Sequence, residues 1–373
     1  MAVERVLMTA DTVGGVWTYA VELARALMAR RVDVHIATMG AALTAAQRES
    51  AAGIPLHESA YRLEWMREPW DDVQAAGNWL QDLEARLAPD VMHLNQFAFG
   101  ALPFRASKVV VAHSCVVSWW QAVHRQRAPA EWDRYRAAVR QGLFQADLVV
   151  APTAAMLAGL ARDYGFDRGG VVIANGRHAD SFRPRDKQCY IMAAGRLWDA
   201  AKNLEALEAV APALPWPVKV AGSRVHPEGG VRGGSHVQLL GELTAPQMAA
   251  ALGQAAIYAL PARYEPFGLS ALEAALCGCA LVLGDIPSLR EVWGEAALYV
   301  PPDDHARLRD TLLRLIADDE LRRAMGTRAR DRASRYTPER MAESYRLAYD
   351  RVRRGHPRGR SIPSTAGERA CAS

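Results

Sequence analysis

Two carboxylates in one short stretch are the residues whose type and spacing most directly suggest chemistry. Glu265 and Glu273 stand eight residues apart, on either side of a Pro-Phe-Gly turn that leads into an apolar helix. Both lie near the predicted helix N-terminus, where backbone N–H groups and the helix dipole favour an anion. An anion-binding backbone beside two hydroxyl-binding carboxylates suits a sugar nucleotide. A solvent-exposed acidic helix start explains the same spacing, and the spacing alone leaves both interpretations open.

A glycine pair and a cationic pair occupy comparable places in the two halves of the chain. Gly14 and Gly15 follow the first predicted strand and open a helix, where glycine lets the backbone approach a phosphate closely. A tight strand-to-helix turn is the alternative. Arg196 follows Gly195 at the end of the second half's first strand, and Lys202 precedes the next helix. The two cations on one loop could clamp a diphosphate, or they are solvated surface charges.

Two further features of the first half have more than one interpretation. His113 ends a very apolar strand, so it either packs locally or reaches a cleft at the strand's carboxyl end. The segment 119–140 combines tryptophan with many arginines and could contact an anionic acceptor or lipid head groups. The arginines are spread over several helical faces, which favours an amphipathic helix with tryptophan in the core and arginine in solvent.

Alternating short strands and longer helices must position these residues. The predicted strands cover 3–9, 32–38, 91–94, 109–113, 148–151, 190–194, 218–221, 237–240, 257–259 and 280–284. The predicted helices cover 16–30, 80–87, 131–146, 154–164, 203–210, 245–253, 306–317 and 338–354. Strands that are apolar throughout indicate parallel sheets covered on both faces. At 373 residues the chain favours two such doubly wound, Rossmann-like α/β domains, with ligands in the cleft between them.

Composition sets limits on compartment and partners. The net charge of +4 is small for this length, and we predict no nucleic acid partner. The five cysteines form neither a disulfide framework nor a zinc motif, which indicates a reducing compartment. The N-terminus does not read as a signal peptide, and no apolar run is long enough to span a membrane. We therefore expect a cytoplasmic protein, with at most peripheral contact at the inner membrane face.

In this combination and order, the residues resemble the retaining glycosyltransferases of family 4, which have the GT-B fold of two Rossmann-like domains. The most specific match is the E-x7-E motif within EPFGLSALEAALCG, which begins at Glu265. The pattern from Gly195-Arg196 to Lys202-Asn203 is the second match. The similarity extends over almost the whole chain, from the glycine pair to the terminal helix.

The resemblance implies a division of the chain. Residues 1–178 would form an acceptor-side domain and residues 179–335 the nucleotide-sugar donor domain. Residues 336–354 would form a helix that crosses back onto the first domain. Residues 355–373, rich in Gly, Pro, Ser and Arg, are predicted to be a disordered tail.

The resemblance also implies roles for individual residues. Arg196 and Lys202 would neutralise the donor diphosphate, Glu265 would bind hydroxyls of the transferred sugar, and Glu273 would hold the ribose. His113 matches the family's cleft histidine near the reacting sugar. The remaining implied donor-binding positions are Gly14, Gly15, Gly195, Leu243, Phe267, Gly268, Leu269 and Ser270.

The implied reaction transfers a hexose, with retention, from a UDP-, GDP- or ADP-sugar to a hydroxyl of a polysaccharide, glycolipid or small molecule. We expect a front-face displacement without a metal or other cofactor, because the paired cations would stabilise the leaving diphosphate. One departure from the family is Cys279-Ala280 where Pro-Val is common; another is the Pro287-Ser288 loop. Glu291 nevertheless stands at the position of a common family acid.

Two alternatives belong to other classes. A sugar-nucleotide epimerase of the same fold would consume its donor without an acceptor. A catalytically silent member would only bind a sugar nucleotide or a partner protein. The intact set of Glu265, Glu273, Arg196 and Lys202 argues against silence, because a silent copy has no need of all four.

Overall fold

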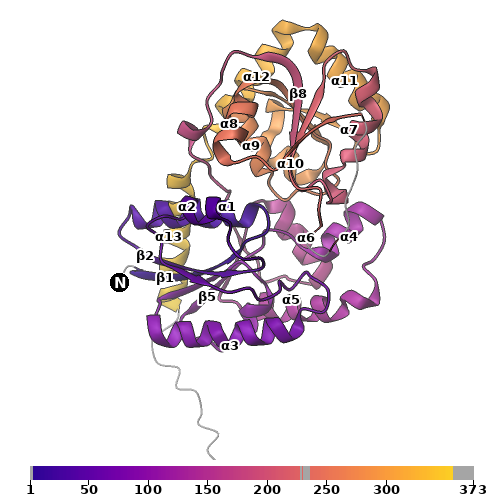
Figure 1. The fold of residues 1–373 in the computed structure, drawn as a ribbon. Coiled ribbons are helices and arrows are strands. Elements are labelled where there is room, and N and C mark those ends of the chain that lie inside the picture. The colour runs from indigo at the N-terminus through magenta and orange to yellow at the C-terminus, as the bar shows by residue number, and fades with distance from the viewer. Residues whose placement is uncertain (1–2, 227–228, 230–235, 356–373) are drawn as a thin grey trace, which may run out of the picture.

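The computed structural model describes residues 3–226, 229 and 236–355. Two parallel-sheet domains lie one above the other, as Figure 1 shows. The Gly-rich segment 229–234 of the sequence lies outside the described residues, apart from Gly229. The predicted tail at 355–373 does so too, apart from Gly355.

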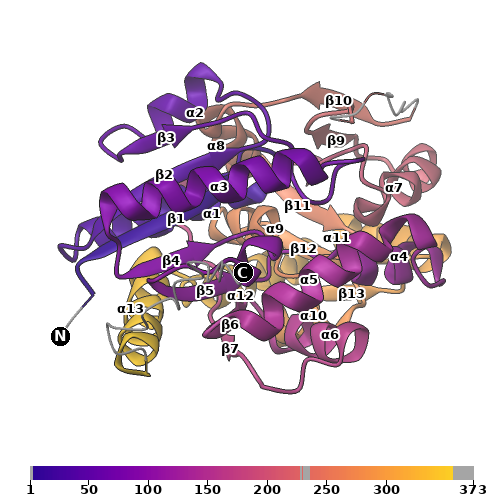
Figure 2. The ribbon, with the colours of Figure 1, turned by 90° about the horizontal axis from the view of Figure 1, so that it is seen from below.

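The first domain is built on a sheet of seven parallel strands in the order β3-β2-β1-β4-β5-β6-β7. The strands are β1 (Arg5–Asp11), β2 (Asp33–Met39), β3 (Leu56–Glu58), β4 (Val91–Leu94), β5 (Ser107–Val111), β6 (Leu148–Ala151) and β7 (Val171–Val172). The helices are α1 (Gly15–Met28), α2 (Ala45–Ser50), α3 (Trp70–Leu87), α4 (Val116–His124), α5 (Asp133–Gln145) and α6 (Ala154–Tyr164). Figure 2 shows several of these helices against the sheet from below.

The second domain repeats this plan with six parallel strands in the order β10-β9-β8-β11-β12-β13. The strands are β8 (Gln188–Ala194), β9 (Val218–Ala221), β10 (Gln238–Gly241), β11 (Ala255–Leu260), β12 (Ala280–Gly284) and β13 (Leu298–Val300). The helices are α7 (Leu204–Val210), α8 (Ala245–Gln254), α9 (Leu269–Leu276), α10 (Pro287–Trp293), α11 (His305–Ala317) and α12 (Asp319–Ala333).

Both sheets are covered on both faces, as the apolar strands predict. Successive residues of a strand point to opposite faces. In β1, Val6 and Met8 accordingly enter one apolar cluster while Leu7 enters another. In β8, Met192 and Ile191 divide in the same way between the two clusters of the second domain. The predicted architecture of two doubly wound domains is confirmed.

The last helix, α13 (Pro338–Gly355), returns to the first domain, where Figure 1 shows it beside β1 and β5. Its side chains Met341, Tyr345 and Tyr349 are buried in the same cluster as α1 and β1. The chain thus crosses between domains twice. At Gly176 the two crossings touch so closely that a Cβ would lie 2.4 Å from the backbone of Thr337. The boundary at residue 178 stays a prediction.

Several elements differ from the sequence-based expectation. Helix α3 begins at Trp70, ten residues before the predicted start at Leu80. The prediction missed this first half because it is largely polar and contains Gly77. The expected strand 109–113 is β5, which ends at Val111 and leaves His113 in the following loop. Elements α2, α4, α10, α12, β3 and β13 were not predicted as such; they are short or, in α12, mostly polar.

Candidate functional site

The cationic loop after β8 meets the first carboxylate of the motif. Lys202 Nζ lies 2.5 Å from Glu265 Oε2, and these two side chains are only 16% and 13% exposed. Arg196 donates from Nη2 to Asp199 Oδ2 at 3.0 Å, and its guanidinium lies over the Trp198 ring. Asp199 therefore fixes the guanidinium of Arg196 through Nη2, while the Arg196 side chain stays 34% exposed. The structure brings the two predicted cations and Glu265 into one group.

The glycine turn of the first domain faces this group. Gly14 has φ +91°, and a Cβ there would lie 3.6 Å from Arg196 Cδ. A Cβ on Gly15 would lie 3.4 Å from Cδ1 of Leu269, the first residue of α9. The predicted turn, cationic loop and motif helix therefore converge from two domains, which their separation in the sequence could not establish.

The motif turn leaves the start of α9 open to a ligand. Gly268 is the N-cap residue in a left-handed conformation, and it provides no capping side chain. The first amides of a helix have no partner within the helix, so those of Leu269 and Ser270 suit an anion. Glu265 Oε1 accepts from the Gly268 amide at 3.0 Å, which fixes the carboxylate beside this helix end. Phe267 of the turn is buried, and its ring packs against that of Tyr336, with the centroids 5.5 Å apart.

Glu273 is held by an arginine that the sequence analysis missed. Arg177 Nε donates to Glu273 Oε1 at 2.8 Å, and Arg177 Nη1 pairs with Glu22 of α1. The three side chains are nearly buried. Burial raises the pKa of Glu273, while Arg177 lowers it and Glu22 raises it. One guanidinium therefore links an acid from each domain.

His113 lies on the first domain's side of the site. Its Nε2 is 2.8 Å from Asn95 Oδ1, and burial lowers the pKa of His113 to about 3, so the ring is neutral. Two residues further on, the Cys115 amide donates to the Tyr264 hydroxyl at 3.0 Å. Because Tyr264 precedes Glu265, this contact joins the His113 loop of the first domain to the motif of the second domain.

A buried acid, Asp11, ends β1 beside the glycine turn and was also missed. It accepts from the Val13 amide at 2.6 Å and from Trp65 Nε1 at 3.2 Å. Burial raises the pKa of Asp11 to about 7, although Arg196 lowers it. Glu64, buried close by, also has a pKa raised to about 7 by burial. Position at a strand's carboxyl end was the one available signal for Asp11.

Other predicted positions lie apart from this group or only support it. Leu243 follows β10 and packs against the apolar core of the second domain. Gly195 lies against the side chain of Lys202, since a Cβ on Gly195 would be 3.6 Å from Lys202 Cγ. Glu291 accepts hydrogen bonds from the first amides of α6, at Ala154 and Ala155. It therefore joins the two domains.

The aromatic and basic segment 119–140 folds as parts of two helices, α4 and α5. Trp119 of α4 donates from Nε1 to Asp199 Oδ1 at 2.8 Å and so braces the cationic loop. Arg134 and Arg140 lie over the rings of Trp70 and Phe144, each 4.8 Å from the ring centroid. These contacts give the segment a structural role.

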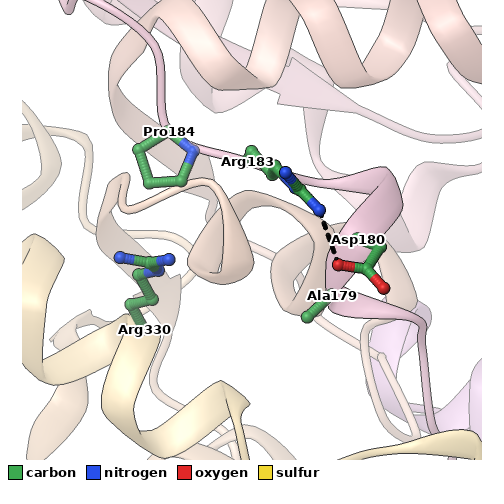
Figure 3. Close-up of a pocket in the computed structure, with 5 residues that line it drawn as sticks. All are labelled: Ala179, Asp180, Arg183, Pro184 and Arg330. Atoms are coloured by element: carbon green, nitrogen blue, oxygen red, sulfur yellow. Dashed lines mark hydrogen bonds and ion pairs between the residues drawn. The ribbon is translucent and has the colours of Figure 1, made fainter.

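A cavity of about 520 Å³ lies elsewhere, at the crossing between the domains (Figure 3). It is lined by Ala179, Asp180, Arg183, Pro184 and Arg330. Figure 3 shows Arg183 turned to Asp180, with which it pairs at 2.7 Å. None of the predicted site residues lines this cavity. Within the described part of the chain, no three His, Cys, Asp or Glu side chains gather to hold a metal ion.

Family models match both domains. Residues 13–180 match the model described as Glycosyltransferase Family 4, and residues 231–332 match that described as Glycosyl transferases group 1. The chain therefore belongs to the glycosyltransferases of family 4 type.

No helix in the described residues is long and apolar enough to cross a membrane.

Curated relatives align over a limited region. A phosphatidyl-myo-inositol mannosyltransferase of Mycolicibacterium smegmatis is 34% identical over 104 residues, which is 27% of each chain. A D-inositol 3-phosphate glycosyltransferase of Corynebacterium jeikeium is 34% identical over 111 residues, 29% of this chain and 26% of that one. The alignments thus span about a quarter of these relatives' length.

Solved structures show the fold over nearly the whole chain. Sucrose-phosphate synthase from Thermosynechococcus elongatus superposes with a TM-score of 0.78 at 19% identity, covering 94% of this chain and 100% of that one. HepE of Anabaena, in complex with UDP and glucose, gives 0.72 at 15% identity, covering 93% and 99%. The predicted GT-B fold is confirmed.

Proposed function

We propose that the protein is a retaining glycosyltransferase that moves a hexose from a nucleoside diphosphate sugar to a hydroxyl group of an acceptor. The contact between Lys202 and Glu265 at the start of α9 carries this proposal. This contact supports the proposal because a cation, which suits a diphosphate, and a carboxylate, which suits sugar hydroxyls, lie together at one helix end. Arg196 and the Gly14 turn complete the group from either side.

The negative charge that develops on the leaving group accounts for the proposed roles of the cationic residues. Breaking the anomeric C–O bond leaves negative charge on the departing diphosphate. Arg196, Lys202 and the first amides of α9 are preorganised to stabilise that charge, usually the largest catalytic contribution. These cations take the place of a metal ion in the proposed mechanism.

We propose retention by front-face displacement. The acceptor oxygen forms its bond to the anomeric carbon on the face from which the diphosphate leaves. The acceptor proton passes to the departing phosphate oxygen, so that no protein nucleophile is required. Glu265 then orients the sugar through its hydroxyls, and Glu273 contacts the ribose while it remains paired with Arg177.

The donor is proposed as a UDP-, GDP- or ADP-sugar. The structures of HepE from Anabaena with UDP and with UDP-glucose support a nucleoside diphosphate sugar. The similarity to HepE is at the level of fold, so the base and the sugar are left to experiment.

A donor panel tests the proposal. Purified protein is incubated with UDP-, GDP- and ADP-hexoses, with and without alcohol and sugar acceptors, and nucleotide release is measured. We expect release from one donor class that increases with acceptor, persists in EDTA, and gives a product with the donor's anomeric configuration by NMR. Conversion of the donor without acceptor would indicate an epimerase instead. If no donor binds or is consumed, the proposal fails.

A further inference from the structure

A continuous chain of hydrogen bonds leads from the C-terminal helix to His113. The Tyr349 hydroxyl of α13 lies 2.6 Å from His93 Nδ1. His93 Nε2 lies 3.2 Å from Asn95 Oδ1, which lies 2.8 Å from His113 Nε2. Tyr349 and His93 are fully buried and Asn95 is 9% exposed. Buried polar groups are almost always paired, so each donor and acceptor in this chain can be assigned.

Asn95 sets the direction of the network. Its backbone N–H donates to Thr9 Oγ1 at 2.8 Å, and its Nδ2 donates to the Thr9 carbonyl. A carbonyl oxygen only accepts, so the amide nitrogen of Asn95 must face Thr9 and Oδ1 must face the two imidazoles. Oδ1 also only accepts. His113 must therefore donate from Nε2–H. His93 Nε2 lies 3.2 Å from both Asn95 Oδ1 and the Tyr19 hydroxyl, and because Oδ1 only accepts, His93 also donates from Nε2–H, shared between these two oxygens.

The protonation of the other ring nitrogen of each histidine follows from this assignment. His93 Nδ1 carries a lone pair and accepts from the Tyr349 hydroxyl. His113 Nδ1 also carries a lone pair, and no hydrogen bond reaches it from the described residues. The Cys115 amide ties the loop of His113 to Tyr264 of the second domain. Nδ1 is thus the ring nitrogen of His113 left for a substrate.

We propose that Asn95, backed by His93 and Tyr349, is a positioning residue that holds His113 in its neutral Nε2–H form and presents Nδ1 as a hydrogen-bond acceptor. An acceptor nitrogen cannot bond to an unprotonated phosphate oxygen but can accept from a hydroxyl. His113 accordingly contacts a hydroxyl of the sugar or of the acceptor, not the diphosphate. This substrate role rests on the proposed function, whereas the ring's protonation does not.

The surroundings of His113 agree with a neutral ring. The titratable side chains packed against it are His93 on β4 and Tyr19 on α1, whose ring centroid is 4.4 Å away. Burial lowers the pKa of both histidines to about 3, and burial raises that of Tyr19 well above its usual value. Neither neighbour provides a negative charge that would stabilise an imidazolium.

Nitrogen-15 NMR of histidine-labelled protein tests the assignment directly. Long-range proton–nitrogen spectra distinguish the two neutral tautomers from the imidazolium, and a His113→Gln variant identifies the His113 signals. We expect the Nε2–H pattern for His113, unchanged between about pH 5.5 and 8. An Nδ1–H pattern or an imidazolium at neutral pH would overturn the proposal.

Asn95→Asp tests the positioning role. A carboxylate in contact with the ring should raise the pKa of His113 from about 3 by about 1–3, so an imidazolium signal grows as the pH falls towards about 4.5. Asn78→Asp, which adds the same charge on the exposed side of α3, should leave the His113 signals unchanged. Unchanged signals in Asn95→Asp as well would refute the role of Asn95.

Tyr349→Phe provides a second variant that keeps the core filled. It should shift the signals of His93, which loses its partner on Nδ1, and leave His113 as Nε2–H because Thr9 still fixes Asn95. A change of tautomer at His113 in this variant would contradict the assignment. These spectra need no turnover, so a failed donor panel would remove the proposed function without touching this result.

Discussion

At Lys202 the proposed chemistry depends on a single ammonium group. Lys202→Ala should lower kcat about 10- to 150-fold, because a charge-assisted hydrogen bond worth about 1.5–3 kcal/mol to the leaving group is lost. The free energy of unfolding should fall by a smaller amount, since Glu265 retains the Gly268 amide as a partner. Steady-state kinetics and denaturant unfolding measure the two effects.

A double variant tests whether the loss of stability comes from the orphaned carboxylate. Lys202→Ala with Glu265→Gln removes that uncompensated charge, so the free energy of unfolding should recover relative to Lys202→Ala alone. Normal turnover in Lys202→Ala would show that the cation does not act on the diphosphate.

The buried acid Asp11 should give stability a dependence on pH. Its pKa is raised from 3.8 to about 7, so between these values the folded protein binds a proton that the unfolded chain does not. Its contribution to stability is therefore lost as the pH rises through that window. Asp11→Asn should accordingly gain stability relative to the wild type between about pH 5 and 8.

Denaturant unfolding of both proteins across that pH range measures the difference. The Asn side chain keeps one of the two acceptor oxygens of Asp11, so a constant offset between the curves is expected as well. A difference that does not vary with pH would show that Asp11 titrates normally.

Site residues were predictable from the sequence where the information is local. Glu265, Gly268 and Glu273 share one turn and helix, so their common location follows from spacing. The pair of Arg177 with Glu22 could not be foreseen, because it joins a domain crossing to α1. Asp11 offered only its place at a strand end, and its altered pKa depends on burial by the folded chain.

At the scale of elements, α6 is capped from the other domain. The Glu291 carboxylate of α10 accepts from the Ala154 and Ala155 amides at 2.7 and 2.9 Å. Glu291→Ala should cost about 0.5–2 kcal/mol, the usual value of a helix cap, and should raise KM for the donor because the cap also holds the domains together. Unfolding and steady-state kinetics measure both.

Asp318→Ala is the matched control for that variant. Asp318 caps α12 through the Leu321 amide at 2.9 Å, entirely within the second domain. It should lose similar stability without a change in KM. Equal KM values in the two variants would argue against a role of Glu291 between the domains.

Helices and strands could be predicted where their apolar residues form a clear periodic pattern or a continuous run. The central strands of both sheets are continuous apolar runs, and their type was correctly predicted. Helix α12 has a stripe of only Met325, Gly326, Ala329 and Ala333 in a strongly charged sequence, so periodicity does not reveal it. Helix α10 begins at Pro287, where the Pro-Ser pair predicts a loop.

At the scale of the whole molecule, the first domain is completed by the end of the chain. Met341 of α13 is 2% exposed and lies in the cluster formed by α1 and β1. Met341→Ala should therefore lower the free energy of unfolding by about 2–5 kcal/mol, the usual cost of truncating a buried large side chain. Leu347 on the same helix is 56% exposed, and Leu347→Ala should change stability by less than about 0.5 kcal/mol.

Hydrogen exchange shows which domain α13 stabilises. If α13 completes the first domain, its loss of packing should reduce the protection of amides there and not in the second domain. Hydrogen exchange in Met341→Ala should accelerate in β1 and β5 and remain slow in β11 and β12. Faster exchange confined to the second domain would mean that α13 does not complete the first domain in solution. The site between the domains depends on this arrangement, because α13 also brings Tyr349 to His93 behind His113.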